Sequence, residues 1–372
     1  MRLSVRGTVL AVLTAACSVG APAGTAAAAT VACGAVLTSD VVLTRDLHCS
    51  GDGLLVGADD LTIDLNGHRI AGSGIGTAIR TDTPAGPFGS VTVRNGTIRD
   101  FGTGVALALW HGTGAHLSGL TVRGNDTGIS GYGSYGGIEV ADSVFVDNAS
   151  YAIQGAGNRV TINRSRFQGN GNGVFTTLSG SQTVSASTFV SNRIGLSASQ
   201  NGIGLTGSTF RNNDTGVLAY LSGLDASSNT FTGGRIGLDV TEELFKVAVA
   251  GNAFTGAGVG LRLTGTLTDS PVAEVRQNTF TRNGSSGLLV DVSDPDLARL
   301  EVSDNTFSRN GFAPGSGEPT AGVRANTGTF TGNTAVGNAG YGIEGYGILD
   351  GGGNHARRNG ATPQCLGVTC TP

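Results

Sequence analysis

Short runs of alternating apolar and polar residues, separated by turns rich in Asn and Gly, cover the chain from about residue 33 onward. Apolar residues do not recur at spacings of three and four over even ten residues, so the pattern predicts short β-strands and no helices. Two of the segments are almost identical: NTFTRNG at 278–284 and NTFSRNG at 305–311. The pattern therefore indicates a repeated structural unit.

A phenylalanine marks each unit and recurs at intervals of 21 to 27 residues. The marked positions are Phe145, Phe167, Phe189, Phe210, Phe231, Phe254, Phe280, Phe307 and Phe330. We expect Ile70, Ile98 and Val122 to hold the same place upstream. Three residues after these positions comes an asparagine in eight units: Asn125, Asn148, Asn170, Asn192, Asn213, Asn283, Asn310 and Asn333. A Gly-Ile-x-Val sequence or a relative of it follows each turn.

Three β-like runs in a unit of about 22 residues, stacked about 4.8 Å apart, describe one coil of a parallel β-helix. Alternation places Val, Ile, Leu and Phe inside, and a stacked turn Asn can hydrogen-bond to the next coil. We expect an all-β solenoid of about a dozen coils with three short strands per coil. Every coil must turn at the same point with the same backbone geometry, which explains why the heptad is repeated.

The ends of the chain differ from the repeat. Residues 1–29 read as a secretory signal, with Arg2 and Arg6 before a short apolar stretch and small residues at 26–30. A lipid anchor at Cys17 is disfavoured because Thr14 stands where a lipobox usually has Leu. No later apolar run is long enough to span a membrane. We expect a secreted protein with an N-terminal cap at 30–56, the β-helix at 57–359, and a disulfide-containing tail at 360–372.

Four cysteines remain after removal of the signal, an even number that suggests disulfides in an exported protein. Sequence proximity favours Cys33–Cys49 and Cys365–Cys370. The alternative, a metal or redox site, lacks CxxC spacing.

The amino-acid composition limits the classes of partner that the protein is expected to bind. Of the 372 residues, 39% are apolar, which argues against disorder, and the 63 glycines show no period of three. Only 13% are charged, the net charge is −4, and there is no basic block, so we expect no nucleic-acid partner. We also expect the protein to be a monomer.

The segments LTIDLNGHRI at 61–70 and VTVRNGTIRDF at 91–101, together with the NxF…N…GI units, resemble the right-handed β-helix repeat proteins of the pectin-lyase-like superfamily. The resemblance spans nearly all of 33–359 and implies a right-handed coil. That superfamily includes polysaccharide lyases, polygalacturonases, pectin esterases, epimerases and non-catalytic surface proteins, so a polysaccharide partner is implied by analogy. The same analogy puts the substrate groove along the Gly-Ile-x-Val strands. Their outward positions are Ala106, Ser130, Gln154, Phe175, Ser197, Leu218, Asp239, Arg262, Leu289, Arg324 and Glu344, followed two residues later by Ala108, Tyr132, Thr177, Tyr220, Thr241, Thr264, Asp291 and Tyr346.

Polar chemistry on that face concentrates between about residues 220 and 296. Tyr220, Asp239, Arg262 and Asp291 fall on successive or near-successive coils, which predicts one patch. The adjoining loops add Glu242, Glu243, Lys246, Asp294 and Asp296. The coils also lengthen here, and Gly234 and Ala257 replace the turn Asn, which is a departure from the repeat that often marks function.

Uronate β-elimination is the first enzymatic hypothesis for this patch. It needs a cation beside the substrate carboxylate and a base for the adjacent C–H. Arg262, or a Ca²⁺ bound by Asp239 and Asp291, is expected to supply the cation, and Lys246 or Arg262 the base. Ca²⁺ is the one cofactor that the patch suggests.

Glycoside hydrolysis by a carboxylate pair, Asp239 with Glu242 or Asp291, is the second hypothesis. The known signatures of polygalacturonases and pectate lyases are absent from the sequence. The acidic loop after Asp239 is equally compatible with a solvated surface in which Lys246 pairs with Glu242 or Glu243. A non-catalytic extracellular surface or matrix protein that binds through its long face is therefore the alternative function.

Trp110 is a further candidate, since an exposed Trp can stack on a sugar ring. Packing against its loop neighbours is the competing interpretation. The five histidines are scattered and indicate no copper or zinc site.

Overall fold

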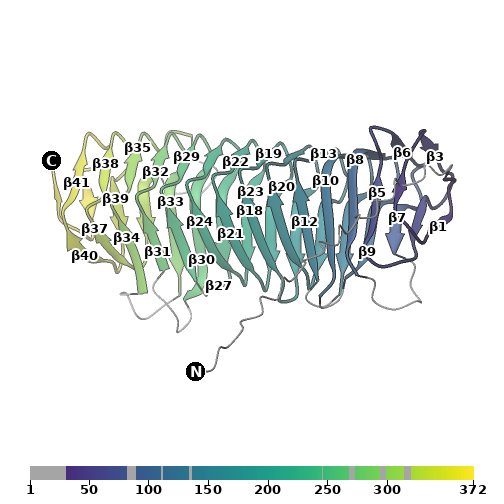
Figure 1. Ribbon diagram of the computed structural model, residues 1–372. Coiled ribbons are helices and arrows are strands. Elements are labelled where there is room, and N and C mark those ends of the chain that lie inside the picture. The colour runs from purple at the N-terminus through teal and green to yellow at the C-terminus, as the bar shows by residue number, and fades with distance from the viewer. Residues whose placement is uncertain are drawn as a thin grey trace, which may run out of the picture.

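The computed structural model describes residues 31–81, 89–109, 112–133, 136–244, 246–267, 273–293, 299–313 and 320–372. These residues form parallel strands wound into a solenoid of about 13 turns, and they contain no helix. Figure 1 shows the coils side by side along a rod, with the C-terminus at one end. The predicted all-β solenoid with three strands per coil is confirmed.

Sheet 1, which carries the Gly-Ile-x-Val strands, opens each coil. Its strands, in spatial order, are β1 (Ala35–Leu37), β4 (Leu54–Val56), β7 (Thr77–Thr81), β9 (Thr103–Ala108), β11 (Thr127–Tyr132), β14 (Tyr151–Ala156), β17 (Asn172–Thr177), β20 (Ile194–Ser199), β23 (Thr215–Tyr220), β26 (Ile236–Thr241), β30 (Val259–Leu267), β33 (Ser286–Val292), β36 (Ala321–Ala325), β39 (Ile343–Gly345) and β42 (Cys365–Leu366). A short strand, β27 (Glu243–Leu244), pairs with the end of β30.

Sheet 2 follows the first corner of each coil. Its strands are β2 (Val41–Val42), β5 (Leu61–Asp64), β8 (Val91–Arg99), β10 (Gly114–Arg123), β12 (Gly137–Ala141), β15 (Arg159–Asn163), β18 (Ser181–Ser185), β21 (Gly202–Thr206), β24 (Gly223–Ser227), β28 (Val247–Ala250), β31 (Ala273–Arg276), β34 (Leu300–Ser303), β37 (Thr329–Thr331) and β40 (Leu349–Gly352).

Sheet 3 carries the phenylalanines and closes each coil. Strands β8 and β10 continue into it, and its remaining strands are β3 (Leu47–His48), β6 (Arg69–Ala71), β13 (Val144–Val146), β16 (Arg166–Gln168), β19 (Thr188–Val190), β22 (Thr209–Arg211), β25 (Thr230–Thr232), β29 (Ala253–Thr255), β32 (Thr279–Thr281), β35 (Thr306–Ser308), β38 (Thr334–Val336), β41 (Asn354–Arg357) and β43 (Cys370–Thr371).

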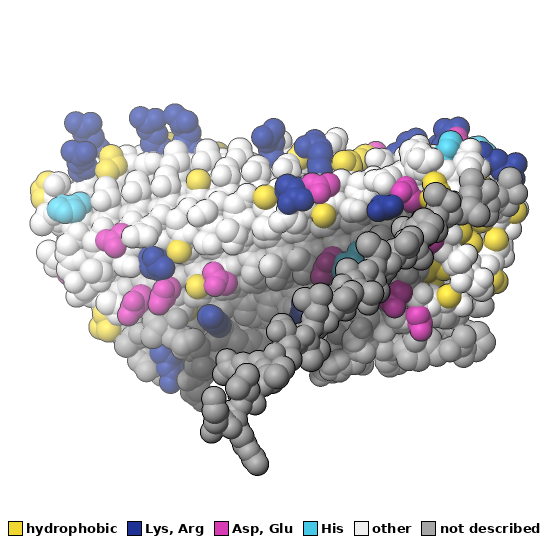
Figure 2. Space-filling model, in the orientation of Figure 1, with side chains coloured by type: hydrophobic (Ala, Val, Ile, Leu, Met, Phe, Trp, Pro, Cys, Tyr) yellow, Lys and Arg dark blue, Asp and Glu magenta, His cyan; other side chains and the backbone are white. Residues whose placement is uncertain are grey.

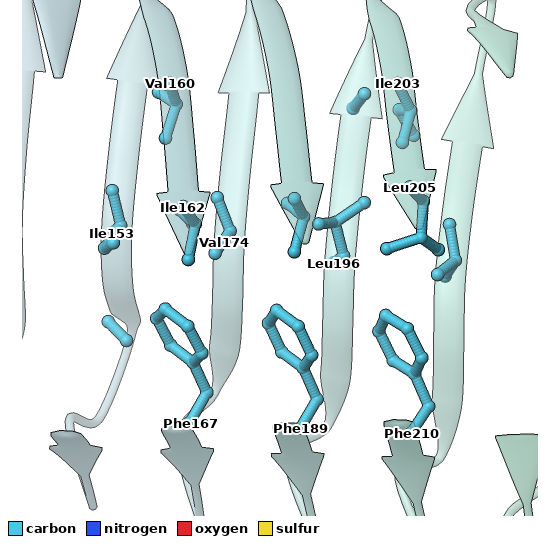
Figure 3. Close-up of a cluster of buried hydrophobic side chains, with 14 of the residues drawn as sticks. Ile153, Val160, Ile162, Phe167, Val174, Phe189, Leu196, Ile203, Leu205 and Phe210 are labelled. Carbon is cyan, nitrogen blue, oxygen red and sulfur yellow. The ribbon is translucent and has the colours of Figure 1, made fainter. Parts of the chain in front are cut away.

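The phenylalanines form a continuous stack in the core. From Phe145 to Phe307 the side chains are buried, consecutive ring centroids lie 4.7–5.0 Å apart, and the ring planes agree within 12°. Figure 3 shows Phe167, Phe189 and Phe210 in this arrangement, beside rows of Val, Ile and Leu from sheets 1 and 2. Strand pairing also places Ile70, Ile98 and Val122 in line with Phe145, as expected.

Phe330 does not continue this stack, so its predicted place is wrong. It lies in β37 of sheet 2 and pairs with Val302, whereas Ala335 pairs with Phe307. The coil after Phe307 is longer than the spacing of phenylalanines suggests, because the chain between β35 and β36 adds residues before the next sheet 1 strand. Phe330 is still buried, since the sheet 2 column also faces the core.

Buried asparagines form two ladders parallel to the phenylalanine stack. In the first, Asn170 Nδ2 donates to Asn192 Oδ1 and Asn192 Nδ2 donates to Asn213 Oδ1, both at 2.9 Å. The predicted hydrogen bonding between turn amides is thus confirmed. The prediction is wrong for Asn333, which belongs to the second ladder between Asn305 and Asn354. Asn338 takes its place after Asn310.

The glycine of the Gly-Ile-x-Val sequence is explained by close backbone approach. A Cβ built on Gly216 would lie 2.3 Å from the carbonyl oxygen of Gly237, and one on Gly237 would lie 2.5 Å from that of Gly260. No real Cβ contact is that short, so successive coils need glycine here to stack at the spacing of paired strands.

Disulfides close both ends of the described chain: Cys33–Cys49 and Cys365–Cys370, as expected. The 30–56 segment also contributes strands to the stack, because β1, β2 and β3 pair in parallel with β4, β5 and β6. A search of the described residues for a helix long and apolar enough to cross a membrane finds none.

Candidate functional site

The outward column predicted on sheet 1 is a continuous row across paired strands. Leu218 pairs with Asp239, Asp239 with Arg262, Arg262 with Leu289, and Leu289 with Arg324. Glu344, the last of the predicted outward positions, pairs with Arg324 on one side and with Leu366 of the final coil on the other. Parallel pairing without a bulge therefore places residues 20 to 35 positions apart in sequence on one line.

A hollow of about 440 Å³ lies on this row toward the C-terminal end of sheet 1. We call it the C-terminal groove; its lining residues are Arg262, Thr264, Leu289, Val290, Asp291, Arg324, Ala325, Asn326 and Tyr346. Two of the predicted site residues, Arg262 and Asp291, are brought together here.

Tyr346 provides the aromatic surface of the groove. Its side chain is 58% exposed, and the Arg324 guanidinium carbon lies 5.7 Å from the ring centroid, a cation–π distance. The phenol donates to Glu344 Oε1 at 2.9 Å. That hydrogen bond to a carboxylate raises the pKa of Tyr346 above its ordinary value, so the phenol keeps its proton further into the alkaline range than a free tyrosine. The ring is thus held in place with one face available for stacking.

Asp291 and Asn326 form the polar wall of the groove. Asn326 Nδ2 donates to Asp291 Oδ1 at 3.2 Å and to the Val292 carbonyl at 3.0 Å, while its Oδ1 accepts from the Val292 N–H at 3.0 Å. These contacts fix the amide and orient the exposed carboxylate. A carboxylate beside an aromatic ring is suited to accepting hydrogen bonds from sugar hydroxyls.

Arg262 joins the groove to Asp239. Its Nε donates to Asp239 Oδ1 at 2.8 Å and its Nη2 to Oδ2 at 2.5 Å, a two-point ion pair. The Asp239 side chain is 5% exposed and that of Arg262 is 33% exposed. Arg262 therefore faces the groove as a cation that is already paired with a buried carboxylate. Because arginine stays protonated in proteins, Arg262 is poorly suited to the role of base that the sequence suggested for it.

The other predicted residues lie apart from the groove. Tyr220 is 40% exposed and pairs with Thr241, on the N-terminal side of β30. Lys246 is exposed and precedes β28, where its carbonyl accepts from the Leu224 N–H, so it lies beyond the corner that ends sheet 1. No ion pair joins Lys246 to Glu242 or Glu243, the pairing that the sequence suggested as an alternative.

A second hollow, of about 740 Å³, follows this corner beside Glu243. Its other lining residues are Ser179, Gly180, Gln200, Asn201, Gly202, Leu221 and Gly223. Its lining is mixed polar and apolar, Glu243 is its one charged lining residue, and it contains none of the predicted catalytic side chains.

The structure does not bring Asp239 and Asp291 together as two ligands of one ion. They lie on β26 and β33, which both pair with β30 and not with each other, and Arg262 occupies the Asp239 carboxylate. Within the described part of the chain, no group of three or more His, Cys, Asp or Glu side chains is arranged to hold a metal. Ca²⁺ binding at these two residues remains a prediction without a shared site.

Trp110, Asp294 and Asp296 lie outside the described residues. Sequence reasoning placed Arg324 and Tyr346 on the outward face without assigning them to the patch, and it did not identify Asn326. The available signal was the repeat itself, since counting coils places both residues beside Asp291.

Comparison with known proteins identifies the repeat. A family model described as right-handed beta helix region matches residues 45–194 and 192–359. Among solved structures, the chain is similar to the catalytic unit of a thermostable GH87 alpha-1,3-glucanase from Streptomyces thermodiastaticus strain HF3-3, with 14% identity and a TM-score of 0.42. The match covers 87% of this chain and spans 64% of that one. It is also similar to the A-module of the mannuronan C-5 epimerase AlgE4 from Azotobacter vinelandii, with 12% identity, a TM-score of 0.25, and coverage of 90% and 91% of the two chains. A search of curated protein sequences gives no match.

Proposed function

Because the chain belongs to the right-handed β-helix family, we propose that it is an extracellular protein that binds an acidic polysaccharide in the C-terminal groove of sheet 1. The observation that carries the proposal is the juxtaposition of Tyr346, Arg324 and Asp291 in one hollow. The two disulfides support an extracellular location, since such bonds persist in oxidising compartments.

Each groove residue matches one feature of a uronate sugar. The apolar face of a sugar ring stacks on an aromatic ring, which is the role of Tyr346. A sugar carboxylate accepts two parallel hydrogen bonds from a guanidinium, which is the role of Arg324. Arg324 is exposed and forms no ion pair with a described residue, so its charge is available to a ligand. Asp291, oriented by Asn326, accepts from hydroxyls.

The binding proposal is tested by replacing Arg324 with Gln and Tyr346 with Ala together. We expect the Kd for a short oligogalacturonide, measured by isothermal titration calorimetry, to rise by about 10- to 100-fold, because both stacking and a charged contact are lost. The matched control replaces Arg159 with Gln and Tyr132 with Ala; Tyr132 is an exposed tyrosine near the end of β11, on the same face of sheet 1. An equal loss of affinity in the control contradicts the proposal.

β-Elimination on the bound uronate is the second candidate, and one observation favours it: Arg262 and Asp291 both face the groove beside Arg324. In this scheme Arg262, held by Asp239, and Arg324 neutralise the substrate carboxylate, and the exposed carboxylate of Asp291 in the same groove takes the adjacent proton. Lys246, the base that the sequence suggested, lies beyond the corner that ends sheet 1 and does not line the groove. Elimination leaves an unsaturated product end, which absorbs ultraviolet light.

The enzymatic candidate predicts that the wild-type protein generates unsaturated ends from polygalacturonate. Replacing Asp239, Arg262 and Asp291 with Ala is then expected to lower the rate at least about 100-fold, as for removal of a general base. Equal rates for the triple variant and the wild type contradict this site. Binding without any product contradicts the lyase activity and leaves a non-catalytic binding protein.

A further inference from the structure

Three arginines occupy one corner of the last coils, where sheet 3 ends and the chain turns toward sheet 1. Arg282, Arg309 and Arg358 each follow two residues after the core column of sheet 3. Arg282 N–H donates to the Ser308 carbonyl and Arg309 N–H to the Val336 carbonyl, so the three lie on a line along the rod. In the coil between those of Arg309 and Arg358, the same corner position is occupied by Gly337.

The backbone at this corner makes arginine an unexpected residue. All three have positive φ, at 54°, 55° and 56°. Other coils place small or turn-favouring residues with positive φ at the same corner: Asp147, Gly169, Ser191, Asn212, Gly233, Gly256 and Gly337. Left-handed backbone angles are unfavourable for a long side chain, and strain of this kind collects at functional positions. Turn geometry therefore does not explain the arginines.

The three side chains face shared hollows. Arg282 and Arg309 line one of about 540 Å³, together with Phe312, whose side chain is 69% exposed. Arg282, Arg309 and Arg358 together line an adjoining one of about 370 Å³. The aliphatic part of the Arg309 side chain extends toward Gly337 in the next coil. A Cβ built on Gly337 would lie 4.0 Å from Arg309 Cγ. We call this surface, formed by the three arginines and Phe312, the arginine ridge.

The charge of the arginine ridge is uncompensated by described side chains. All three arginines are exposed, and none forms an ion pair with a described residue. Upstream at the same corner, Gly256, Gly233 and Asn212 are uncharged. Figure 2 shows Lys and Arg side chains projecting from the upper edge of the molecule toward its C-terminal end. A positive stripe thus forms on a chain with a net charge of −4.

We propose that the arginine ridge is a second binding site, which takes a linear acidic polysaccharide lying along the rod axis. Guanidinium groups bind carboxylate and sulfate in pairs of hydrogen bonds, and Phe312 offers a stacking face for a sugar ring. The arginines span about 14 Å, three coil steps, which suits a few charged sugars. Duplex nucleic acid carries a charge every ~1.7 Å and is bound by proteins with basic domains, which this chain is not. The site does not depend on the C-terminal groove, which lies on a different part of each coil.

The test replaces Arg282, Arg309 and Arg358 with Gly, in a protein whose groove already carries Arg324→Gln and Tyr346→Ala. Glycine is the natural residue at this corner in other coils, so we expect a Tm equal to or above that of the parent. The Kd for heparin and for polygalacturonate, measured at low salt, should rise on the order of tenfold. Comparing the two polymers shows whether sulfate or carboxylate is preferred.

Two further variants decide the interpretation. Replacing the same three arginines with Lys should retain most of the affinity, because the charge is kept. Replacing Arg159, Arg166 and Arg193 with Gln lowers the net charge equally at exposed positions away from the ridge, and should change Kd by less than about twofold. Equal losses in this control and in the glycine variant overturn the ridge as a site. Tighter binding of duplex DNA than of heparin overturns the polysaccharide as its ligand.

Discussion

Replacing Phe189 with Ala is expected to lower the free energy of unfolding by about 3–5 kcal/mol. Phe189 is fully buried and lies between Phe167 and Phe210, with ring centroids 4.7 Å away on both sides. Truncation removes both stacking contacts and leaves a cavity that neighbouring coils cannot fill, because paired backbones hold them at a fixed spacing. The change should appear as a lower urea midpoint.

The control for this prediction is Phe312→Ala. Phe312 is the same residue type but is 69% exposed, so we expect a change within about 0.5 kcal/mol. If both substitutions destabilise the protein equally, or if neither does, the phenylalanine stack is not a main source of stability.

Replacing Asn192 with Ala is the second substitution with a large expected effect, about 3 kcal/mol or more. Asn192 Nδ2 donates to the Phe167 carbonyl at 3.1 Å and to Asn213 Oδ1 at 2.9 Å. Its Oδ1 accepts from both the Asn170 N–H and Asn170 Nδ2, each at 2.9 Å. Alanine leaves several of these buried groups without partners, and each unsatisfied group costs about 1–3 kcal/mol.

Circular dichroism during urea unfolding measures this effect. Asn212→Gly is the control at the adjacent corner: Asn212 is exposed with φ of 53°, and glycine adopts that angle and keeps the backbone N–H. We expect a change of only a few tenths of a kcal/mol for it. If Asn192→Ala changes the free energy of unfolding only slightly, water must take the place of the lost amide. That result would contradict an asparagine ladder from which water is excluded.

The sequence predicted the solenoid because every coil repeats the same physical task. One apolar column, one corner amide and one glycine at a close backbone approach recur in each unit, so their spacing reveals the coil. The error at Phe330 shows the limit of using one residue type as a marker. The second ladder provides a better signal: from Phe145 onward, Ser or Asn stands two residues before each true column position. Asn333 precedes Ala335 in this way, whereas Gly328 precedes Phe330.

The candidate site was only partly predictable. Alternation identified the outward positions of sheet 1, because side chains on a strand point to opposite faces regardless of coil length. Which of them meet depends on the number of coils between them. Asp291 on β33 contacts Asn326, which directly follows the neighbouring strand β36, although 35 residues separate the two in sequence. The long connection between β33 and β36 hides this proximity in the sequence.

By itself, the sequence determined the fold, the end disulfides and the face that each strand residue occupies, since these follow from local periodicity and proximity. Only the tertiary structure decided that Arg262 is held by Asp239, that Lys246 lies around a corner from both, and that Arg324 and Tyr346 join Asp291. It alone also aligned Arg282, Arg309 and Arg358. The physical reason is that stacking converts positions in different coils into neighbours, and inter-coil register is set by backbone pairing over the whole rod.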